Sequence, residues 1–277
     1  MTSSGSGRNV LVRPPDNQES RCGGGAHTAA PQAARCAQPE GASMSSLDYT
    51  YEHIDDVIDR SNMLTKEIDP ARTMLLVLDM QKACVTPGGA MYIESVAGAP
   101  EGKDTVSVVS RVVDACRDKG IPIVWSMWGL RPDGKDAGYA DVKWGLVGEL
   151  DNFPGAWGNG GDELDDALKP DGDEPVIRKH RFSSFYGTAL TEYMRRAGAD
   201  TLVIAGVSTG NCVITTAIDG ANQDFKIITL ADSNAAIPAT LDNQPDGYGQ
   251  HWEALRNIQA NHGDVWLSTE FLQAIGA

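Results

Sequence analysis

The stretch TLVIAGVSTGNCV, residues 201–213, begins as an apolar run and then changes abruptly to small and turn-forming residues. The apolar part predicts a buried strand, and the amphipathic segment from Val213 to Asn222 predicts a helix. Cys212 stands at the N-terminal end of that helix, where N–H groups and the helix dipole favour negative charge. We therefore expect its thiol to have a lowered pKa and to be a good nucleophile. The alternative is a half-buried structural cysteine, because unpaired cysteines are among the most buried residue types.

Outward from this stretch, apolar runs alternate with segments of helical periodicity. The first strong run, residues 73–78, is apolar on both faces, as a central parallel strand should be. Together these patterns predict an α/β protein, a three-layer α/β/α sandwich with a mostly parallel, Rossmann-like central sheet. Further strands are expected at residues 121–125, 175–179, 201–205, 226–231 and around 265–266, and helices at 106–120, 187–198, 213–222 and 252–259 and at the C-terminus.

Composition places limits on the organisation of the chain. Residues 1–45 are rich in Gly, Ser, Ala, Pro and Gln and are expected to be a disordered tail, leaving 46–277 as one domain. The net charge of −15 argues against nucleic acid or an anionic membrane as a partner. No apolar run approaches the roughly 20 residues of a membrane span. Five cysteines without framework spacing favour a reducing compartment, so we expect a cytoplasmic protein.

Three of the predicted strands end in chemically competent residues, namely Asp79, Lys179 and Cys212. The carboxyl ends of parallel strands share one edge of a sheet, so these side chains are expected to converge on one crevice. A thiolate attacks an acyl carbon, an ammonium stabilises the thiolate, and a carboxylate transfers the proton. Each residue alone has a structural alternative: a turn aspartate, a solvated lysine and a core cysteine.

Three segments resemble the motifs of the isochorismatase-like cysteine hydrolases, in the same order. The similarity runs from about residue 70 to the C-terminus. The segments are LVLDMQ at 76–81 with PGGA at 87–90, KHRFSSFYGT at 179–188, and GVSTGNCV at 206–213 followed by TA at 216–217 and by Ala221.

The resemblance implies an Asp–Lys–Cys catalytic triad at Asp79, Lys179 and Cys212. It also implies a non-proline cis peptide between Val207 and Ser208. The N–H groups of Ser208 and Cys212 would then form an oxyanion hole, a feature that typically contributes 10²–10³-fold to turnover for each donor.

Departures from the family's motifs narrow the expected chemistry. Nicotinamidases of this superfamily carry an Asp-x-His metal motif after the second strand, but residues 125–131 read WSMWGLR. We therefore expect no metal and no cofactor. True isochorismatases do not need a thiol at position 212. What remains is a hydrolase of amide, carbamoyl or ureido C–N bonds, such as an N-carbamoylsarcosine, ureidoacrylate or biuret hydrolase. The alternatives are a hydrolase of the same fold acting on a vinyl ether or lactam, and a binding protein with a vestigial triad.

The substrate of such an enzyme is a small molecule, and aromatic walls with a few polar groups suit one. Candidate substrate-binding residues are Trp128, Arg131, Arg181 and Phe185.

Residues 126–173 lack periodicity, and a long loop of this kind is usually a lid or a pocket wall. Trp144 and Trp157 in it are assigned to a lid or to the interface of a homo-oligomer, a dimer or tetramer. His180 is expected to face away from the crevice because strand residues alternate in direction. His251 is expected at the surface, with a place in the pocket as the alternative.

Overall fold

The computed structural model describes residues 54–89, 104–131, 133–144, 160–236 and 248–277. The proposed tail, residues 1–45, and Trp157 lie outside the described residues. The domain boundary near residue 45 and the expected oligomer therefore stay predictions.

Within the described residues, six strands form one sheet in the order β3-β2-β1-β4-β5-β6, and every neighbouring pair is parallel. The chain builds outward from β1 in one direction and from β4 in the other. The gap between the carboxyl ends of β1 and β4 is thus the point at which the strand order reverses, where open α/β sheets bind ligands. The strands are β1 (Thr73–Leu78), β2 (Ile123–Trp128), β3 (Val176–Lys179), β4 (Thr201–Val207), β5 (Lys226–Ala235) and β6 (Asp264–Trp266).

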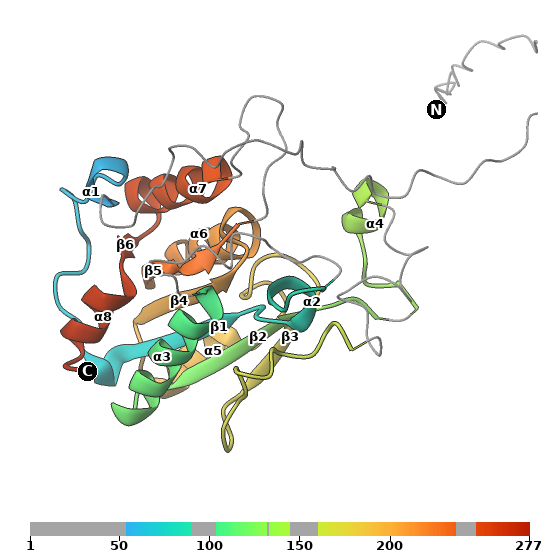
Figure 1. Ribbon diagram of the computed structural model, residues 1–277, viewed down its shortest axis with the longest axis horizontal. Helices are drawn as coiled ribbons and strands as arrows, with labels where there is room; N and C mark the ends of the chain where they lie inside the picture. The colour runs from blue at the N-terminus through green and yellow to red at the C-terminus, as the bar shows by residue number, and fades with distance from the viewer. Residues whose placement is uncertain (1–53, 90–103, 132, 145–159, 237–247) are drawn as a thin grey trace, which may run out of the picture. The chain divides into compact units, whose positions relative to one another are not determined.

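Helices cover both faces of the sheet (Figure 1). They are α1 (Ile54–Val57), α2 (Lys82–Val85), α3 (Thr105–Asp118), α4 (Tyr139–Trp144), α5 (Leu190–Ala197), α6 (Ile214–Ala221), α7 (Tyr248–Asn261) and α8 (Ser268–Ala274). One core cluster packs α3 and α8 on the face that carries Leu75 and Val77 of β1. The other packs α5, α6 and α7 on the face that carries Leu76 and Leu78. The predicted three-layer α/β/α sandwich is confirmed.

The fully buried β1 explains why its sequence is apolar throughout, since both of its faces meet a helical layer. Its side chains alternate between the two clusters, as the period of a strand requires. Helix α5 ends at Gly198, which adopts a left-handed conformation with φ of 70°. Helix α1 is short and lies beside α7, where Ile54 and Ile58 join the same cluster as Trp252 (Figure 1).

Some boundaries differ from the sequence prediction. Strand β5 continues to Ala235, four residues beyond the predicted end, because its later polar residues are buried as well. The aperiodic segment contains a helix, α4, that the sequence pattern does not reveal. Between β4 and α6 the chain forms a single π-helical turn over Thr209–Val213, so the regular helix begins at Ile214.

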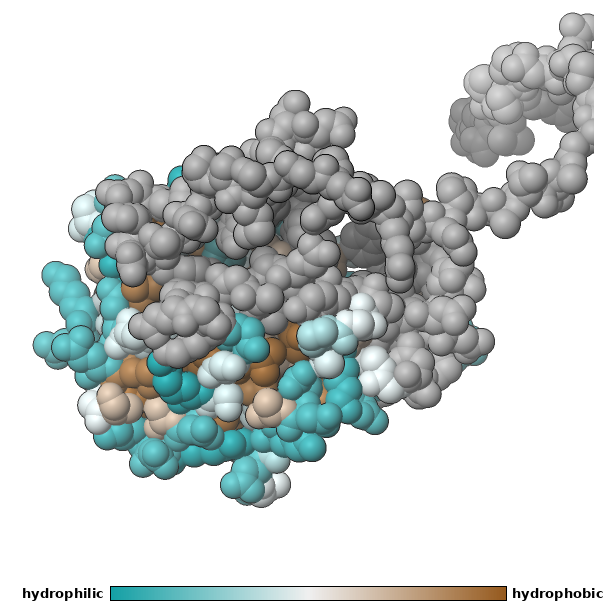
Figure 2. Space-filling model, in the orientation of Figure 1, coloured by the Kyte–Doolittle hydropathy of each residue, from teal (hydrophilic) through white to brown (hydrophobic). Residues whose placement is uncertain are grey.

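The face of the molecule in Figure 2 shows hydrophilic side chains along its lower edge and a smaller hydrophobic area between these and the grey atoms. None of the helices in the described ranges is both long and apolar enough to cross a membrane.

Candidate active site

Asp79 follows the last residue of β1 and lies beside the reversal of strand order. Its backbone has a φ of 54°, a left-handed conformation that non-glycine residues rarely adopt. The amide of Asp79 donates to the carbonyl of Ser126 at 2.9 Å, and its carbonyl accepts from the amide of Gln81 at 2.7 Å. Strained residues of this kind persist where the surrounding structure enforces them, and they cluster at functional sites. The bend holds the carboxylate over the end of the sheet.

Lys179 ends β3, and its side chain is 0% exposed. Its Nζ lies 2.6 Å from Oδ2 of Asp79 and 3.2 Å from Sγ of Cys212. It also donates to the carbonyl of Arg181 at 3.2 Å. A buried ammonium is tolerated only when it is paired and hydrogen-bonded, and these three partners meet that requirement.

Cys212 lies in the π-helical turn after β4, where the carbonyl of Ser208 accepts hydrogen bonds from the amides of Asn211 and Val213. The peptide bond between Val207 and Ser208 is cis. Gly206 allows the end of β4 to lie close against β1, because a Cβ at that position would collide with the carbonyl of Leu78 in β1. The fold therefore brings Cys212 to the same point as Asp79 and Lys179, although the three are far apart in the sequence.

The electrostatics of this cluster correct one expectation. Burial raises the pKa of the Cys212 thiol; Lys179 opposes this shift and the carboxylate of Asp79 adds to it. The predicted lowering of the pKa is wrong, because desolvation and Asp79 outweigh Lys179 and the end of the helix. Burial also raises the pKa of Asp79 against the opposing charge of Lys179. Burial would lower the pKa of Lys179, but Asp79 and Cys212 together raise it.

The thiol is therefore neutral at rest, and the cluster holds an ammonium beside a carboxylate. The carboxyl group of Asp79 lies close enough to Cys212 to add to the rise of the thiol pKa. A carboxylate in contact with a thiol can remove its proton when a substrate arrives, and the ammonium can stabilise the thiolate that results.

Buried hydroxyl groups extend the cluster. Oγ of Ser126 donates to Oδ1 of Asp79 at 3.3 Å and lies 3.0 Å from Oγ of Ser184. The amide of Ser184 donates to Oγ of Thr216 at 3.0 Å. None of these three residues is among the site candidates expected from the sequence. A serine within the otherwise apolar strand β2 is the signal that could have identified Ser126.

Two of the proposed substrate-binding residues lie next to the triad. Trp128 is in register with Lys179, and its backbone N–H and carbonyl both bond the side-chain amide of Gln81, each at 2.8 Å. Arg181 follows Lys179 by two residues, and its Nη1 donates to the carbonyls of Asp136 and His180 at 2.7 and 2.8 Å. Their contact with substrate stays a prediction.

The other two lie in different surroundings. The guanidinium of Arg131 is exposed and pairs with Asp133 at 2.9 Å. Phe185 is buried in the core, where its ring stacks on Phe225 with centroids 5.8 Å apart and packs against Gly220. Hydrophobic packing accounts for the position of Phe185 in the second motif, and its contact with substrate stays a prediction. The side chain of Trp144 is outside the described part of the chain.

His251, in the first turn of α7, is only 3% exposed, so its expected place at the surface is wrong. Its Nδ1 lies 2.8 Å from Oγ1 of Thr209, which begins the turn that carries Cys212. Burial lowers the pKa of His251 to about 3, so the imidazole is neutral near pH 7. His180 is half-buried, and its carbonyl accepts from Arg181.

Two other thiols lie in the described residues. Burial raises the pKa of both Cys84 and Cys116 to about 12, as it raises that of Cys212, so the contact with Lys179 and not the pKa distinguishes Cys212. Neither makes the contact with Lys179 that Cys212 makes. Among the described residues, no group of three His, Cys, Asp or Glu side chains is placed to hold a metal ion.

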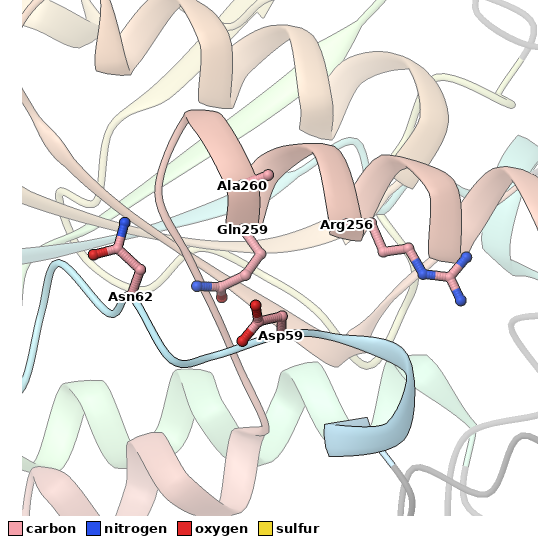
Figure 3. A pocket seen from close by; sticks show the side chains of 5 residues that line it. All are labelled: Asp59, Asn62, Arg256, Gln259 and Ala260. Atoms are coloured by element: carbon pink, nitrogen blue, oxygen red, sulfur yellow. The ribbon is translucent and has the colours of Figure 1, made fainter.

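A pocket of about 400 Å³ lies elsewhere, between the segment after α1 and helix α7 (Figure 3). Asp59 and Asn62 line one side, and Arg256, Gln259 and Ala260 line the other. None of the triad residues contributes to it, so its position offers no route to the chemistry of Cys212.

Comparison with known proteins identifies relatives over most of the chain. The model of the Isochorismatase domain family matches residues 73–262, more than half of the chain. The chain is 33% identical over 224 residues to the ureidoacrylate amidohydrolase RutB of Methylobacterium radiotolerans, covering 76% of this chain and 81% of that protein.

Solved structures agree with this match. A cysteine hydrolase from Pseudomonas syringae pv. phaseolicola superposes with a TM-score of 0.70 at 28% identity, over 78% of this chain and 97% of that one. An N-carbamoylsarcosine amidase from Thermoplasma acidophilum superposes with a TM-score of 0.52 at 25% identity, over 71% and 96% of the two chains.

Proposed function

The chain belongs to the isochorismatase family, and we propose that it is a metal-independent cysteine hydrolase of a small amide, carbamoyl or ureido compound. The reaction cleaves a C–N bond through a thioester intermediate. The observation that carries this proposal is the buried contact of Lys179 Nζ with both Oδ2 of Asp79 and Sγ of Cys212. This contact supports the proposal, because nucleophilic catalysis by cysteine needs a cation to stabilise the thiolate and a nearby base to accept its proton.

In the first half of the reaction Asp79 accepts the proton of the Cys212 thiol, and the ammonium of Lys179 stabilises the thiolate. The sulfur attacks the carbonyl carbon and forms a tetrahedral intermediate. The N–H groups of Ser208 and Cys212 would stabilise the oxyanion. Collapse of the intermediate breaks the C–N bond as Asp79 returns the proton to the leaving nitrogen, which departs as ammonia or an amine.

In the second half Asp79 removes a proton from water, and the oxygen attacks the thioester carbon. Breakage of the C–S bond releases the acid and a thiolate, which takes the proton back from Asp79. The raised pKa of Asp79 favours both roles, since a carboxyl group with a pKa closer to neutrality transfers protons more effectively in both directions.

The relatives indicate which C–N bonds to test. One is named a ureidoacrylate amidohydrolase and another an N-carbamoylsarcosine amidase, and both names describe a small acid that carries a carbamoyl group on nitrogen. We propose that this chain acts on the same class, a small ureido or carbamoyl acid.

Ammonia release from a panel of small compounds tests the proposal. The panel contains ureidoacrylate, N-carbamoylsarcosine, biuret, nicotinamide and simple aliphatic amides. We expect turnover of a ureido or carbamoyl compound, and no turnover after Cys212→Ala. Release of ammonia from no compound, or equal release by the Cys212→Ala variant, would contradict the proposal.

Ser126→Ala is expected to shift the acid limb of the kcat/KM profile to higher pH by a fraction of a unit. The Ser126 hydroxyl lowers the pKa of Asp79 by hydrogen bonding to its carboxylate, so its removal raises that pKa. Because the reaction needs the carboxylate form, the variant loses activity at a higher pH than the wild type as the solution is acidified. An acid limb at an unchanged or lower pH would mean that a group other than Asp79 titrates there.

Arg181→Ala is expected to raise KM for a carboxylate-bearing substrate by about tenfold with less effect on kcat, because it removes a charge–charge contact made equally in ground and transition states. Within the described residues no carboxylate pairs with Arg181. Arg131→Ala is the matched comparison: its guanidinium is already held by Asp133, so we expect a smaller change. Equal effects of the two substitutions on KM would mean that Arg181 is not favoured over Arg131 as the residue that binds the substrate carboxylate.

Treatment with EDTA is expected to leave turnover unchanged, because the proposed mechanism uses only side chains and backbone amides. The assay is ammonia release before and after dialysis against the chelator. Loss of activity that zinc restores would contradict a metal-independent mechanism.

A further inference from the structure

The π-helical turn that carries Cys212 makes side-chain contacts with the first turn of α7, 39 to 42 residues farther along the chain. The side chain of His251 approaches the turn from α7 and meets Thr209, with Nδ1 and Oγ1 2.8 Å apart. The pair is buried, since Thr209 is 0% exposed and His251 is 3% exposed. A buried polar contact of this kind is costly to lose, because the remaining partner keeps an unsatisfied group away from water.

A second contact lies beside the first. Nε2 of Gln250 donates to Oδ1 of Asn211 at 3.3 Å. The Gln250 side chain also packs against the Cα of Gly210, where any Cβ would collide with it. Two consecutive residues of α7 thus contact three consecutive residues of the turn, Thr209, Gly210 and Asn211. The next residue in the chain is Cys212.

We propose that Gln250 and His251 are positioning residues, which hold the Thr209–Val213 turn so that Sγ of Cys212 stays in contact with Lys179 and Asp79. This inference rests on the proposed function. His251 does not touch the reacting atoms in this account, and its imidazole serves as a neutral hydrogen-bonding group. The Thr209 contact fixes the start of the turn, and the Gln250 contacts fix its middle.

The main test compares His251→Phe with His251→Asn. Phenylalanine keeps much of the ring volume but has no polar atom, whereas asparagine places a polar atom near the position of Nδ1. We expect His251→Phe to lower kcat by about 100-fold with little change in KM, since a shift of about 1 Å at a reacting group costs that much. His251→Asn is expected to recover most of the loss.

A second readout is independent of turnover. Hydrogen exchange of peptides covering 208–214 is expected to be about tenfold faster in His251→Phe, as local opening becomes easier, while peptides from β1 and α3 stay unchanged. His262→Phe is the matched control, because His262 follows the other end of the same helix. It is expected to change neither the exchange of the turn nor kcat.

The outcomes are distinguishable. If His251→Phe keeps wild-type kcat and wild-type exchange in the turn but melts at a lower temperature, His251 only packs the core and the inference is wrong. If the wild type hydrolyses no compound, the proposed function fails, while the exchange result still decides the positioning role. If His251→Phe does not fold, Thr209→Val tests the same contact from the other side, with Thr209→Ser as the variant that keeps the hydroxyl.

Discussion

Cys212→Ala is expected to lower kcat by about 10⁴-fold or more, and Asp79→Asn by a similar factor, because each removes an indispensable part of one nucleophilic unit. The double variant is expected to be scarcely slower than either single variant, since a base without its nucleophile and a nucleophile without its base are equally ineffective. The measurement is steady-state ammonia release at saturating substrate, with enzyme concentrations high enough to detect the residual rate.

Cys84→Ala and Cys116→Ala are the matched controls, because each removes a thiol that does not contact Lys179, half-buried at Cys84 and buried at Cys116. They are expected to retain kcat. Losses in the double variant that multiply would mean that Asp79 and Cys212 act in separate steps. If Cys84→Ala lost activity and Cys212→Ala did not, the nucleophile would be Cys84 and not Cys212.

Lys179→Met is expected to be the most destabilising of the proposed single substitutions. The change keeps the length and the apolar stem of the side chain, but it leaves the carboxylate of Asp79 buried without its cation. Removal of one partner from a buried ion pair typically costs about 3–5 kcal/mol of unfolding free energy. Urea unfolding at neutral pH measures this loss, and the same variant should show almost no turnover.

The double variant Asp79→Asn/Lys179→Met provides the control. It removes both charges, so its unfolding free energy should exceed that of Lys179→Met alone. Acidification should also reduce the difference in unfolding free energy between Lys179→Met and the wild type. Without Lys179, the folded-state pKa of Asp79 rises further above its unfolded value, so protonation at lower pH favours the folded state. If this difference in unfolding free energy increased on acidification, the result would contradict a buried ion pair between Asp79 and Lys179.

The sequence indicated most of the fold because its strongest signals are local. The apolar run of β1 predicts a strand that is buried on both faces. Gly198 after an amphipathic segment predicts the end of a helix. The convergence of Asp79, Lys179 and Cys212 also follows from topology, since parallel strands share one carboxyl edge.

Other features depended on contacts that no local pattern encodes. The raised pKa of Cys212 results from how deeply three distant segments bury it together. The burial of His251 results from the packing of α7 against the nucleophile turn, and the core position of Phe185 results from its contact with Phe225. These are products of tertiary packing, in which a polar or aromatic residue finds its partner far along the chain.

The most direct test of the central claim is peptide mass mapping of enzyme quenched in acid during turnover. We expect that the peptide containing Cys212 gains the mass of the acyl group of the substrate, and that peptides containing Cys84 and Cys116 do not. Hydroxylamine added during turnover should divert the same acyl group to its hydroxylamine adduct, an N-hydroxyurea from a ureido or carbamoyl substrate and a hydroxamate from a simple amide. Full turnover with no acyl mass on Cys212 and no hydroxylamine adduct, or an acyl group on a different residue, would contradict the proposed mechanism.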